Sequence, residues 1–276
     1  MNVTIIGLGL IGGSMAMAYH KKGHHVAGYD IDNVTVQWAK LAGVIDEELT
    51  DPESLRKSDL ILLAIGAADT IKWLEENSGY INRDALVIDL CGDKRTICEK
   101  CFPLAEKYGY TFAGGHPMAG TEFSGIKHAK AGLFENQPMV IVPPKRDDIA
   151  LFDRIKKALT PAGFGRYSFT TAEEHDEMIA FTSQLAHVVS NAYVKSPRAQ
   201  RRAGISAGSY RDLTRVAKLN PKMWTELFME NKDYLSEEID NLVTELLKYK
   251  EAMANNDSET LERLLREGSE AKETAG

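Results

Sequence analysis

Short apolar runs alternate with amphipathic segments along the first 170 residues of the chain. Apolar runs bounded by glycine or polar residues are typical of strands buried on both faces of a parallel sheet. Such strands are predicted at residues 2–6, 25–29, 60–65, 85–90, 110–115 and 139–142, and a further short strand is predicted at 166–169. Helical spacing between them predicts helices at residues 34–42, 96–108 and 148–159, and a further helix that carries Ile71, Trp73 and Leu74. This alternation predicts an α/β fold with a doubly wound parallel sheet.

Beyond residue 171 the pattern changes, and no further strand is predicted. A helical stripe of apolar residues runs through 173–194, and Pro197 ends it. Further helices are predicted at 210–219, 221–253 and 258–267, followed by a frayed polar tail at 268–276. We therefore expect two domains, a nucleotide-binding sheet domain of residues 1–170 and an all-helical domain of residues 171–276.

The predicted helix 221–253 carries more large apolar side chains than one face of a small helical domain can cover. They are Trp224, Leu227, Phe228, Tyr234, Leu235, Ile239, Leu242, Leu246 and Leu247. Packing within one chain is one explanation. A two-fold homodimer with interleaved helical domains is the other, and we favour it because it would bury all of them.

A glycine-rich turn follows the first predicted strand. Gly7, Gly9 and Gly12 have the G-x-G-x-x-G spacing, which allows a tight turn, a close approach of a pyrophosphate and close packing of helix on strand. The helix that begins there offers N–H groups and the positive end of its dipole to phosphates. A glycine turn that binds no nucleotide is the alternative, but the strand–turn–helix context favours a Rossmann-type dinucleotide site.

An acidic residue follows the second predicted strand at about the 20-residue spacing expected for a ribose contact. Asp30 would accept hydrogen bonds from the ribose and repel a 2′-phosphate, and no arginine follows it at once. The predicted cofactor is therefore NAD rather than NADP. The predicted cofactor-binding residues are Gly7, Leu8, Gly9, Ile11, Gly12, Asp30 and Gly66.

Composition and charge narrow the class of protein. The chain has 276 residues, 43% of them hydrophobic, enough for two modest domains. Its formal net charge of −7 argues against nucleic acid or an anionic membrane as a partner. No apolar run approaches the roughly 20 residues of a membrane span, and the first strand leaves no room for a signal peptide. We expect a cytoplasmic protein with a small-molecule substrate.

Two of the three cysteines have the spacing of a redox motif. Cys98 and Cys101 lie one helical turn apart in a predicted crossover helix, and no second pair completes a zinc site. We interpret them as packing residues and predict no metal site.

A histidine loop, Gly114-Gly115-His116-Pro117, follows directly on another predicted strand. Ligands of open α/β sheets bind outside the carboxyl ends of the strands. An imidazole with a pKa near ~6.5 is suited to take a proton from an alcohol as hydride leaves. Although a lone histidine is more often structural, His116 is the predicted acid–base group.

The helical segment contains a second group of candidate residues. Gln184 and His187 lie one helical turn apart, so both can point into one cleft. Arg211 and Arg215 have an i, i+4 spacing, and a guanidinium on an interdomain face would bind a carboxylate bidentately. Arg211 has a surface alternative in Asp212, whereas the apolar neighbours of Arg215 predict that it is buried.

Four stretches of this chain, in order, resemble the prephenate/arogenate dehydrogenase family of tyrosine biosynthesis. They are Gly7-Leu8-Gly9-Leu10-Ile11-Gly12-Gly13-Ser14, Gly115-His116-Pro117-Met118-Ala119-Gly120, Ser183-Gln184-Leu185-Ala186-His187 and Tyr210-Arg211-Asp212-Leu213-Thr214-Arg215-Val216-Ala217. Trp224 and Glu230-Asn231-Lys232 also fit. The resemblance spans nearly the whole chain, and the histidine loop is its most specific element.

This resemblance implies NAD⁺-dependent oxidative decarboxylation of prephenate to 4-hydroxyphenylpyruvate, or the corresponding reaction of arogenate. His116 would accept the proton of the ring hydroxyl as hydride passes to NAD⁺, and loss of the ring carboxylate as CO₂ would aromatise the product. His187 and Arg215 would hold the anionic groups of the substrate. The other predicted substrate-binding residues are Thr121, Gln184, Gly208, Arg211 and Trp224.

The chain departs from the family pattern at two places. Gly92 stands where family members often carry a serine that orients the catalytic histidine. Either Asp93 or a backbone group then orients His116, or that role is absent. Gln184 replaces the first histidine of the family's His-Leu-Pro-His, whereas His187 keeps the second.

Two other classes of protein share some of these features. A β-hydroxyacid dehydrogenase has the glycine turn and a helical second domain, but its family carries a catalytic lysine on a glycine-led helix. The corresponding helix here has His187 and Asn191, with Lys195 only at its end. A non-enzymatic NAD-binding protein would need neither His116 nor Arg215 in a cleft. The choice between prephenate and arogenate stays open.

Overall fold

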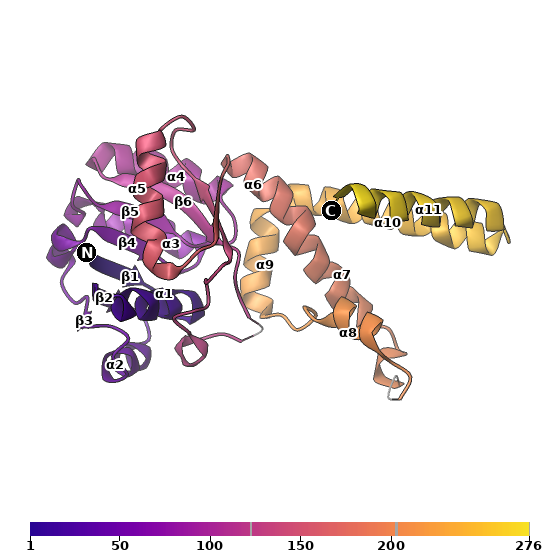
Figure 1. Cartoon of the computed structure of the whole chain (residues 1–276), viewed down its shortest axis with the longest axis horizontal. Helices are drawn as coiled ribbons and strands as arrows, with labels where there is room; N and C mark the ends of the chain where they lie inside the picture. The colour runs from indigo at the N-terminus through magenta and orange to yellow at the C-terminus, as the bar shows by residue number, and fades with distance from the viewer. Residues whose placement is uncertain (122, 202–203, 276) are drawn as a thin grey trace.

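The computed structural model describes residues 1–121, 123–201 and 204–275. Within these residues an eight-stranded sheet has helices on both faces, and a set of helices extends away from it (Figure 1). The strands are β1 (Asn2–Ile6), β2 (His25–Tyr29), β3 (Glu47–Glu48), β4 (Leu60–Leu63), β5 (Leu86–Asp89), β6 (Thr111–Pro117), β7 (Pro138–Val142) and β8 (Arg166–Phe169). Their spatial order is β3-β2-β1-β4-β5-β6-β7-β8.

The last two strands run opposite to the others. β6 pairs antiparallel with β7, with Gly114 opposite Val142, and β7 and β8 are parallel to each other. The prediction of a parallel sheet is confirmed for β1 to β6 and is wrong for β7 and β8. A parallel return needs a crossover connection, usually a helix. The described residues between β6 and β7 contain only the 3₁₀ turn Ile126–His128.

Five helices in the described sheet domain cover the two faces of the sheet. They are α1 (Leu10–Lys21), α2 (Asn33–Leu41), α3 (Ala67–Asn77), α4 (Arg95–Tyr108) and α5 (Ile149–Leu159). The core between the sheet and α1, α2 and α5 includes Ile5 and Leu62. The core under α3 and α4 includes Ile6 and Leu63. Neighbouring residues of the central strands β1 and β4 thus enter opposite cores, as the apolar runs of the sequence require.

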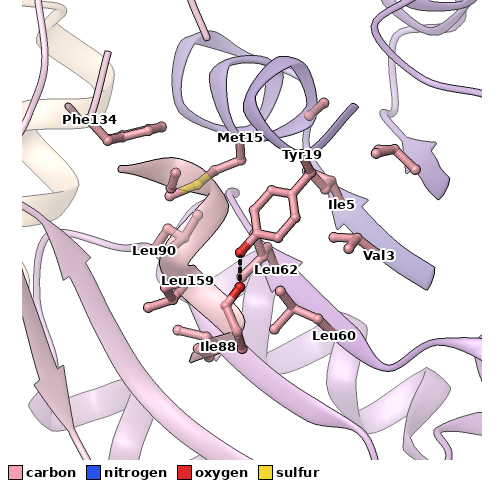
Figure 2. Close-up of a cluster of buried hydrophobic side chains, with 14 of the residues drawn as sticks. Val3, Ile5, Met15, Tyr19, Leu60, Leu62, Ile88, Leu90, Phe134 and Leu159 are labelled. Atoms are coloured by element: carbon pink, nitrogen blue, oxygen red, sulfur yellow. Dashed lines mark hydrogen bonds between the residues drawn. The ribbon is translucent and has the colours of Figure 1, made fainter. Parts of the chain in front are cut away.

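Tyr19 of α1 lies inside the first of these cores (Figure 2). Its ring packs beside Ile5 and Leu62, and its hydroxyl donates to the carbonyl oxygen of Ala158 at 2.7 Å. The buried polar atom is therefore satisfied, and the bond connects α1 to the end of α5.

A long, nearly continuous helix leads out of the sheet domain. It consists of α6 (Ala172–Ile179), a π-helical segment (Ala180–Leu185) and α7 (Ala186–Tyr193). The helices that follow are α8 (Gly208–Thr214), α9 (Pro221–Glu230), α10 (Lys232–Ala254) and α11 (Ser258–Ala275). α10 and α11 form an antiparallel hairpin that points away from the sheet (Figure 1). None of the helices within the described ranges is long and apolar enough to cross a membrane.

Three helix predictions for this part need correction. The predicted helix 221–253 is broken into α9 and α10 at Asn231, whose buried amide donates to the carbonyl oxygen of Asp176 and to Oε1 of Gln184. The predicted helix 210–219 ends at Thr214. The expected frayed tail is instead part of α11, which extends to Ala275, and Gly276 lies outside the described residues.

The three cysteines are free and buried. Cys91 and Cys101 belong to the core under α3 and α4. Burial raises the pKa of the Cys101 thiol to about 12, and it also raises the pKa of Cys98. Thiols with raised pKa values stay protonated and are poor nucleophiles, so the packing interpretation fits their surroundings.

Candidate active site

The glycine turn between β1 and α1 has the form that a pyrophosphate needs. Gly7 has a φ of +88°, which favours glycine. A Cβ on Gly12 would lie 1.8 Å from the carbonyl oxygen of Gly7, so a side chain does not fit there. Nothing lies within 4 Å of the place that a Cβ on Gly9 would take. The start of α1 is therefore open, and its N–H groups fit a bound phosphate.

Asp30 lies at the end of β2, beside this turn. Its Oδ2 accepts the N–H of Leu8 at 2.8 Å and its Oδ1 accepts the N–H of Asp32 at 2.9 Å. These bonds hold the carboxylate where an adenosine ribose would reach it. Gly66 follows β4 at the same edge of the sheet, and a Cβ there would lie 3.8 Å from Oε2 of Glu226 on α9. Helix α9 therefore lies close to this edge.

His116 lies near the end of β6, and its ring is hydrogen-bonded to a residue of α6. Its Nδ1 lies 2.9 Å from Nε2 of His175, and Nδ1 of His175 lies 2.7 Å from Oδ1 of Asp176. His175 and Asp176 are buried. Burial lowers the pKa of His116 well below its ordinary value, and repulsion by the Lys94 ammonium, and by His175 whenever it is protonated, adds to this. The ring is therefore neutral at pH 7 and can accept a proton.

Sequence reasoning missed His175 and Asp176. The signal was a histidine–aspartate pair at the start of the helical part, but His175 is 59 positions from His116, so no local pattern relates them. Asp176 also accepts the backbone N–H groups of Lys94 and Arg95 at 2.8 and 2.9 Å. The same pair therefore holds α6 against the start of α4.

A buried ion pair supports the strand that carries His116. The ammonium of Lys94 contacts Oδ2 of Asp89, and both side chains are fully buried. Asp89 also accepts the N–H of Gly115 at 3.1 Å and the N–H of Cys91 at 2.9 Å. Asp89 thus joins the end of β5 to the residue before His116, and Lys94 compensates its charge.

The loop after β5 does not orient His116 in the way we expected. Gly92 faces Leu227 of α9, and a Cβ at this position would lie 3.0 Å from Cδ2 of that leucine, so a serine would press on α9. Neither carboxylate oxygen of Asp93 has a hydrogen-bond partner within the described residues. Of the three alternatives left open, orientation of His116 by Asp93 or by a backbone group of this loop is wrong, and the loop lacks this role, because His175 takes the Nδ1 side of the ring.

Asp93 is 3% exposed, and burial raises its pKa to about 6. A carboxyl whose pKa is raised on folding destabilises the folded state when it is ionised. We expect Asp93→Asn to increase the free energy of unfolding at pH 7 by on the order of 2–3 kcal/mol. The gain should shrink as the pH falls through 6 towards 4, because the native carboxyl then takes up its proton.

Urea unfolding of the two proteins across this pH range measures the gain. Asp84→Asn is the matched control, because Asp84 is an exposed aspartate on the loop before β5. A gain that is equal at pH 7 and pH 4, or one that the control shares, would contradict an ionised, unpartnered Asp93.

His187 and Trp224 form a second cluster in the helical part. Their ring centroids are 4.0 Å apart at 31°. The Nδ1–H of His187 donates to the carbonyl oxygen of Ser183 at 2.8 Å, so in the neutral ring the lone pair is on Nε2. Burial lowers the pKa of His187, and the charge of Arg215 lowers it further. His187 would therefore bind an anionic group only in its protonated form.

Gln184 does not share a cleft with His187 as we expected. Its side chain is buried, its Nε2 donates to the carbonyl oxygen of Leu227 at 3.3 Å, and its Oε1 accepts from Asn231 at 2.9 Å. Gln184 lies in the π-helical segment, whereas His187 lies in α7. Gln184 thus joins this segment to α9 and α10.

Arg211 and Arg215 are both exposed. Arg211 lies 3.7 Å from its neighbour Asp212, as its surface alternative predicts. The predicted burial of Arg215 is wrong, because α8 lies away from the sheet and the neighbouring Leu213 is itself 43% exposed (Figure 1). Apolar neighbours in sequence did not mean an apolar environment in space.

Two further predicted residues have few contacts in the described chain. Thr121 is exposed, and its hydroxyl accepts the N–H of Phe123 at 3.2 Å. Gly208 is the first residue of α8. His175 lies in α6 and His187 lies in α7, with the π-helical segment Ala180–Leu185 between them.

Comparison with known proteins connects these features to a family. The model of the nucleotide-binding domain of prephenate dehydrogenase matches residues 15–165, and the model of its dimerization domain matches residues 171–267. Prephenate dehydrogenase of Bacillus subtilis is 32% identical over 276 residues, which cover 95% of this chain and 72% of the relative.

Solved structures agree over nearly the whole length. Prephenate dehydrogenase from A. aeolicus in complex with hydroxyphenyl propionate and NAD⁺ has a TM-score of 0.82 and 27% identity, covering 100% of this chain and 98% of that chain. Synechocystis arogenate dehydrogenase has a TM-score of 0.81 and 26% identity, covering 100% of both chains. The glycine turn, the histidine at the end of β6 and the helical second part thus occur in a chain that belongs to the prephenate dehydrogenase family.

Proposed function

We propose that this chain catalyses the NAD⁺-dependent oxidative decarboxylation of prephenate to 4-hydroxyphenylpyruvate. The observation that carries this proposal is the placement of His116 at the end of β6, with Nδ1 bonded to His175 and Nε2 left to take a proton. The similarity to a prephenate dehydrogenase solved with NAD⁺ supports the same reaction.

The residues of the turn after β1 fit the cofactor. Gly7 and Gly12 leave no room for side chains, and the start of α1 would bind the pyrophosphate while Asp30 would bind the adenosine ribose. NAD⁺, when bound, supplies the acceptor for hydride. The other proposed cofactor-binding residues are Leu8, Gly9, Ile11 and Gly66.

His116 is the proposed catalytic base. Its neutral ring would accept the proton of the substrate's ring hydroxyl at Nε2 as hydride leaves the same carbon. The ring carboxylate then leaves as CO₂ and its bonding electrons complete the aromatic ring, so the step is effectively irreversible. The resulting phenolate oxygen takes back the proton from Nε2 of His116 and becomes the hydroxyl of the product. Arg215, and His187 in its protonated form, are proposed to hold the anionic groups of the substrate, with Trp224 packed beside His187. Thr121, Gly208 and Arg211 remain proposed substrate contacts.

Asp30→Ala is expected to weaken NAD⁺ binding by about 1–3 kcal/mol, because a charge-assisted hydrogen bond to the ribose is lost. Binding is measured by the quenching of tryptophan fluorescence on titration with NAD⁺. Asp32→Ala is the matched control. Asp32 lies two residues after Asp30 and caps α2, so its replacement should leave the affinity for NAD⁺ nearly unchanged. A wild type that turns over faster with NADP⁺ than with NAD⁺ would show that the cofactor assignment is wrong.

Steady-state kcat/KM with prephenate and with arogenate, each with NAD⁺ and NADP⁺, tests the proposed function. Prephenate with NAD⁺ should give the highest value. Arogenate is the second candidate substrate, because Synechocystis arogenate dehydrogenase is similar over the full length of both chains. If the folded protein reduces NAD⁺ with neither substrate, both proposed activities are refuted.

We propose that the chain acts as a homodimer in the cytoplasm. We also propose a boundary between its two domains near residue 170, between β8 and α6. Exposed apolar side chains lie along the α10–α11 hairpin: Val243, Leu246, Leu247, Met253 and Leu265. The match of this part to a dimerization domain supports a second copy as their cover. Sedimentation equilibrium should give twice the chain mass of 30.6 kDa.

A further inference from the structure

The ring of His116 is oriented by a chain of hydrogen bonds that begins in α6. Oδ1 of Asp176 lies 2.7 Å from Nδ1 of His175, and Nε2 of His175 lies 2.9 Å from Nδ1 of His116. We propose that His175 and Asp176 are positioning residues that hold His116 in the tautomer with the proton on Nδ1 and the lone pair on Nε2. This role rests on the proposed function, in which His116 is the base.

The direction of the hydrogen bonds follows from the ionisation of Asp176. Although burial opposes ionisation, the hydrogen bonds from His175 and from the backbone of Arg95 and Lys94 leave the pKa of Asp176 below its ordinary value. An ionised carboxylate can only accept, so Nδ1 of His175 must carry the proton.

The tautomer of His175 then decides that of His116. Burial lowers the pKa of His175, so its ring is neutral at pH 7 and has its lone pair on Nε2. The short contact requires one donor, which must be the Nδ1–H of His116. Nε2 of His116 is then the atom that can take a proton from a substrate.

The same arrangement stabilises the product of proton transfer. Once Nε2 of His116 is protonated, the ring donates from Nδ1 to His175, which is polarised by the ionised Asp176 behind it. A carboxylate that fixes the tautomer of an imidazole base, and stabilises the imidazolium that forms, has the same role in catalytic triads. Here a second imidazole stands between the two.

Arg95 connects this hydrogen-bond chain to the second part of the molecule. Its Nε lies 3.3 Å from Oδ2 of Asp176, and its terminal nitrogens contact Asp233 of α10 at 2.5 and 2.7 Å and Asn231 at 2.9 Å. The residues that orient His116 are therefore fixed to both α4 and α10. The base has its orientation only when the helical part is packed on the sheet domain.

The direct test is the tautomer of His116 in the wild-type dimer. Long-range ¹H–¹⁵N correlation spectra of protein labelled with ¹⁵N-histidine distinguish a protonated from an unprotonated ring nitrogen, and His116→Asn identifies the signals. At pH 7.5 we expect a protonated Nδ1 and a bare Nε2 on His116. A protonated Nε2 would overturn the proposal, whether or not the protein oxidises prephenate.

Variants of His175 separate positioning from simple packing. His175→Leu removes the acceptor and should lower kcat by about 10²-fold or more while KM changes by less than about twofold. His175→Gln retains an acceptor oxygen and should recover most of that loss. Equal kcat values in the wild type and both variants would overturn the proposal, and so would equal losses in both variants accompanied by lower melting temperatures. If His175→Leu does not fold, the wild-type spectrum still decides.

Discussion

Replacing His116 by asparagine is expected to lower kcat by about 10²- to 10⁴-fold, the range for loss of a general base, with a much smaller change in substrate KM. The pH profile gives a second readout. Because the pKa of His116 is lowered, chiefly by burial, the wild-type rate should fall only when the pH drops well below 6.5. The asparagine variant should lack this acidic limb.

His20→Asn is the matched control for this variant. His20 lies in the last turn of α1, at the opposite end of that helix from the glycine turn. Its replacement should leave kcat and the pH profile of kcat unchanged. An asparagine variant at position 116 that keeps more than a tenth of the wild-type kcat would exclude His116 as the base. The tautomer measurement would be unaffected by that outcome.

Lys94→Met is expected to lower the free energy of unfolding by about 3–5 kcal/mol. The substitution leaves Asp89 charged and buried without its compensating ammonium, and breaking a buried pair on one side has a cost of this size. Guanidinium unfolding followed by circular dichroism measures the loss.

Two comparisons show whether the uncompensated charge is the cause. Lys100→Met removes an exposed lysine of α4, the helix that follows Lys94, and should change stability by no more than about 1 kcal/mol, because Lys100 pairs only with the exposed Glu99 at 3.4 Å. Adding Asp89→Asn to Lys94→Met should restore part of the loss, because the amide oxygen can still accept the N–H of Gly115. A double variant no more stable than Lys94→Met would argue against this explanation.

Most strands could be predicted from the sequence. The predicted bounds of β1, β2 and β8 match the observed ones. For β1 the reason is its apolar run, since a strand buried on both faces needs apolar residues at most positions. The two-residue β3 carries no periodic signal. The direction of β7 could not be predicted from the sequence either, because it depends on the path of the preceding connection and not on the residues of the strand.

The break at Asn231 could not be predicted either. The apolar spacing continues across it, and the reason for the break is the set of buried hydrogen bonds that Asn231 makes to Asp176 and Gln184. These partners are about 50 positions away in the chain, which is why local periodicity predicted one helix.

The sequence by itself determined the features that depend on neighbouring residues: the strands and helices of the sheet domain, the glycine turn, the acid at the end of β2 and a histidine at the end of β6. Only the tertiary structure decided how His116 is held, that Lys94 compensates Asp89, that Gln184 joins helices and that Arg215 is exposed. Burial and hydrogen-bond partners depend on segments far apart in the chain that the fold brings together. A turn or a strand depends on sterics and hydrophobic spacing within a few residues, and a single sequence records these directly.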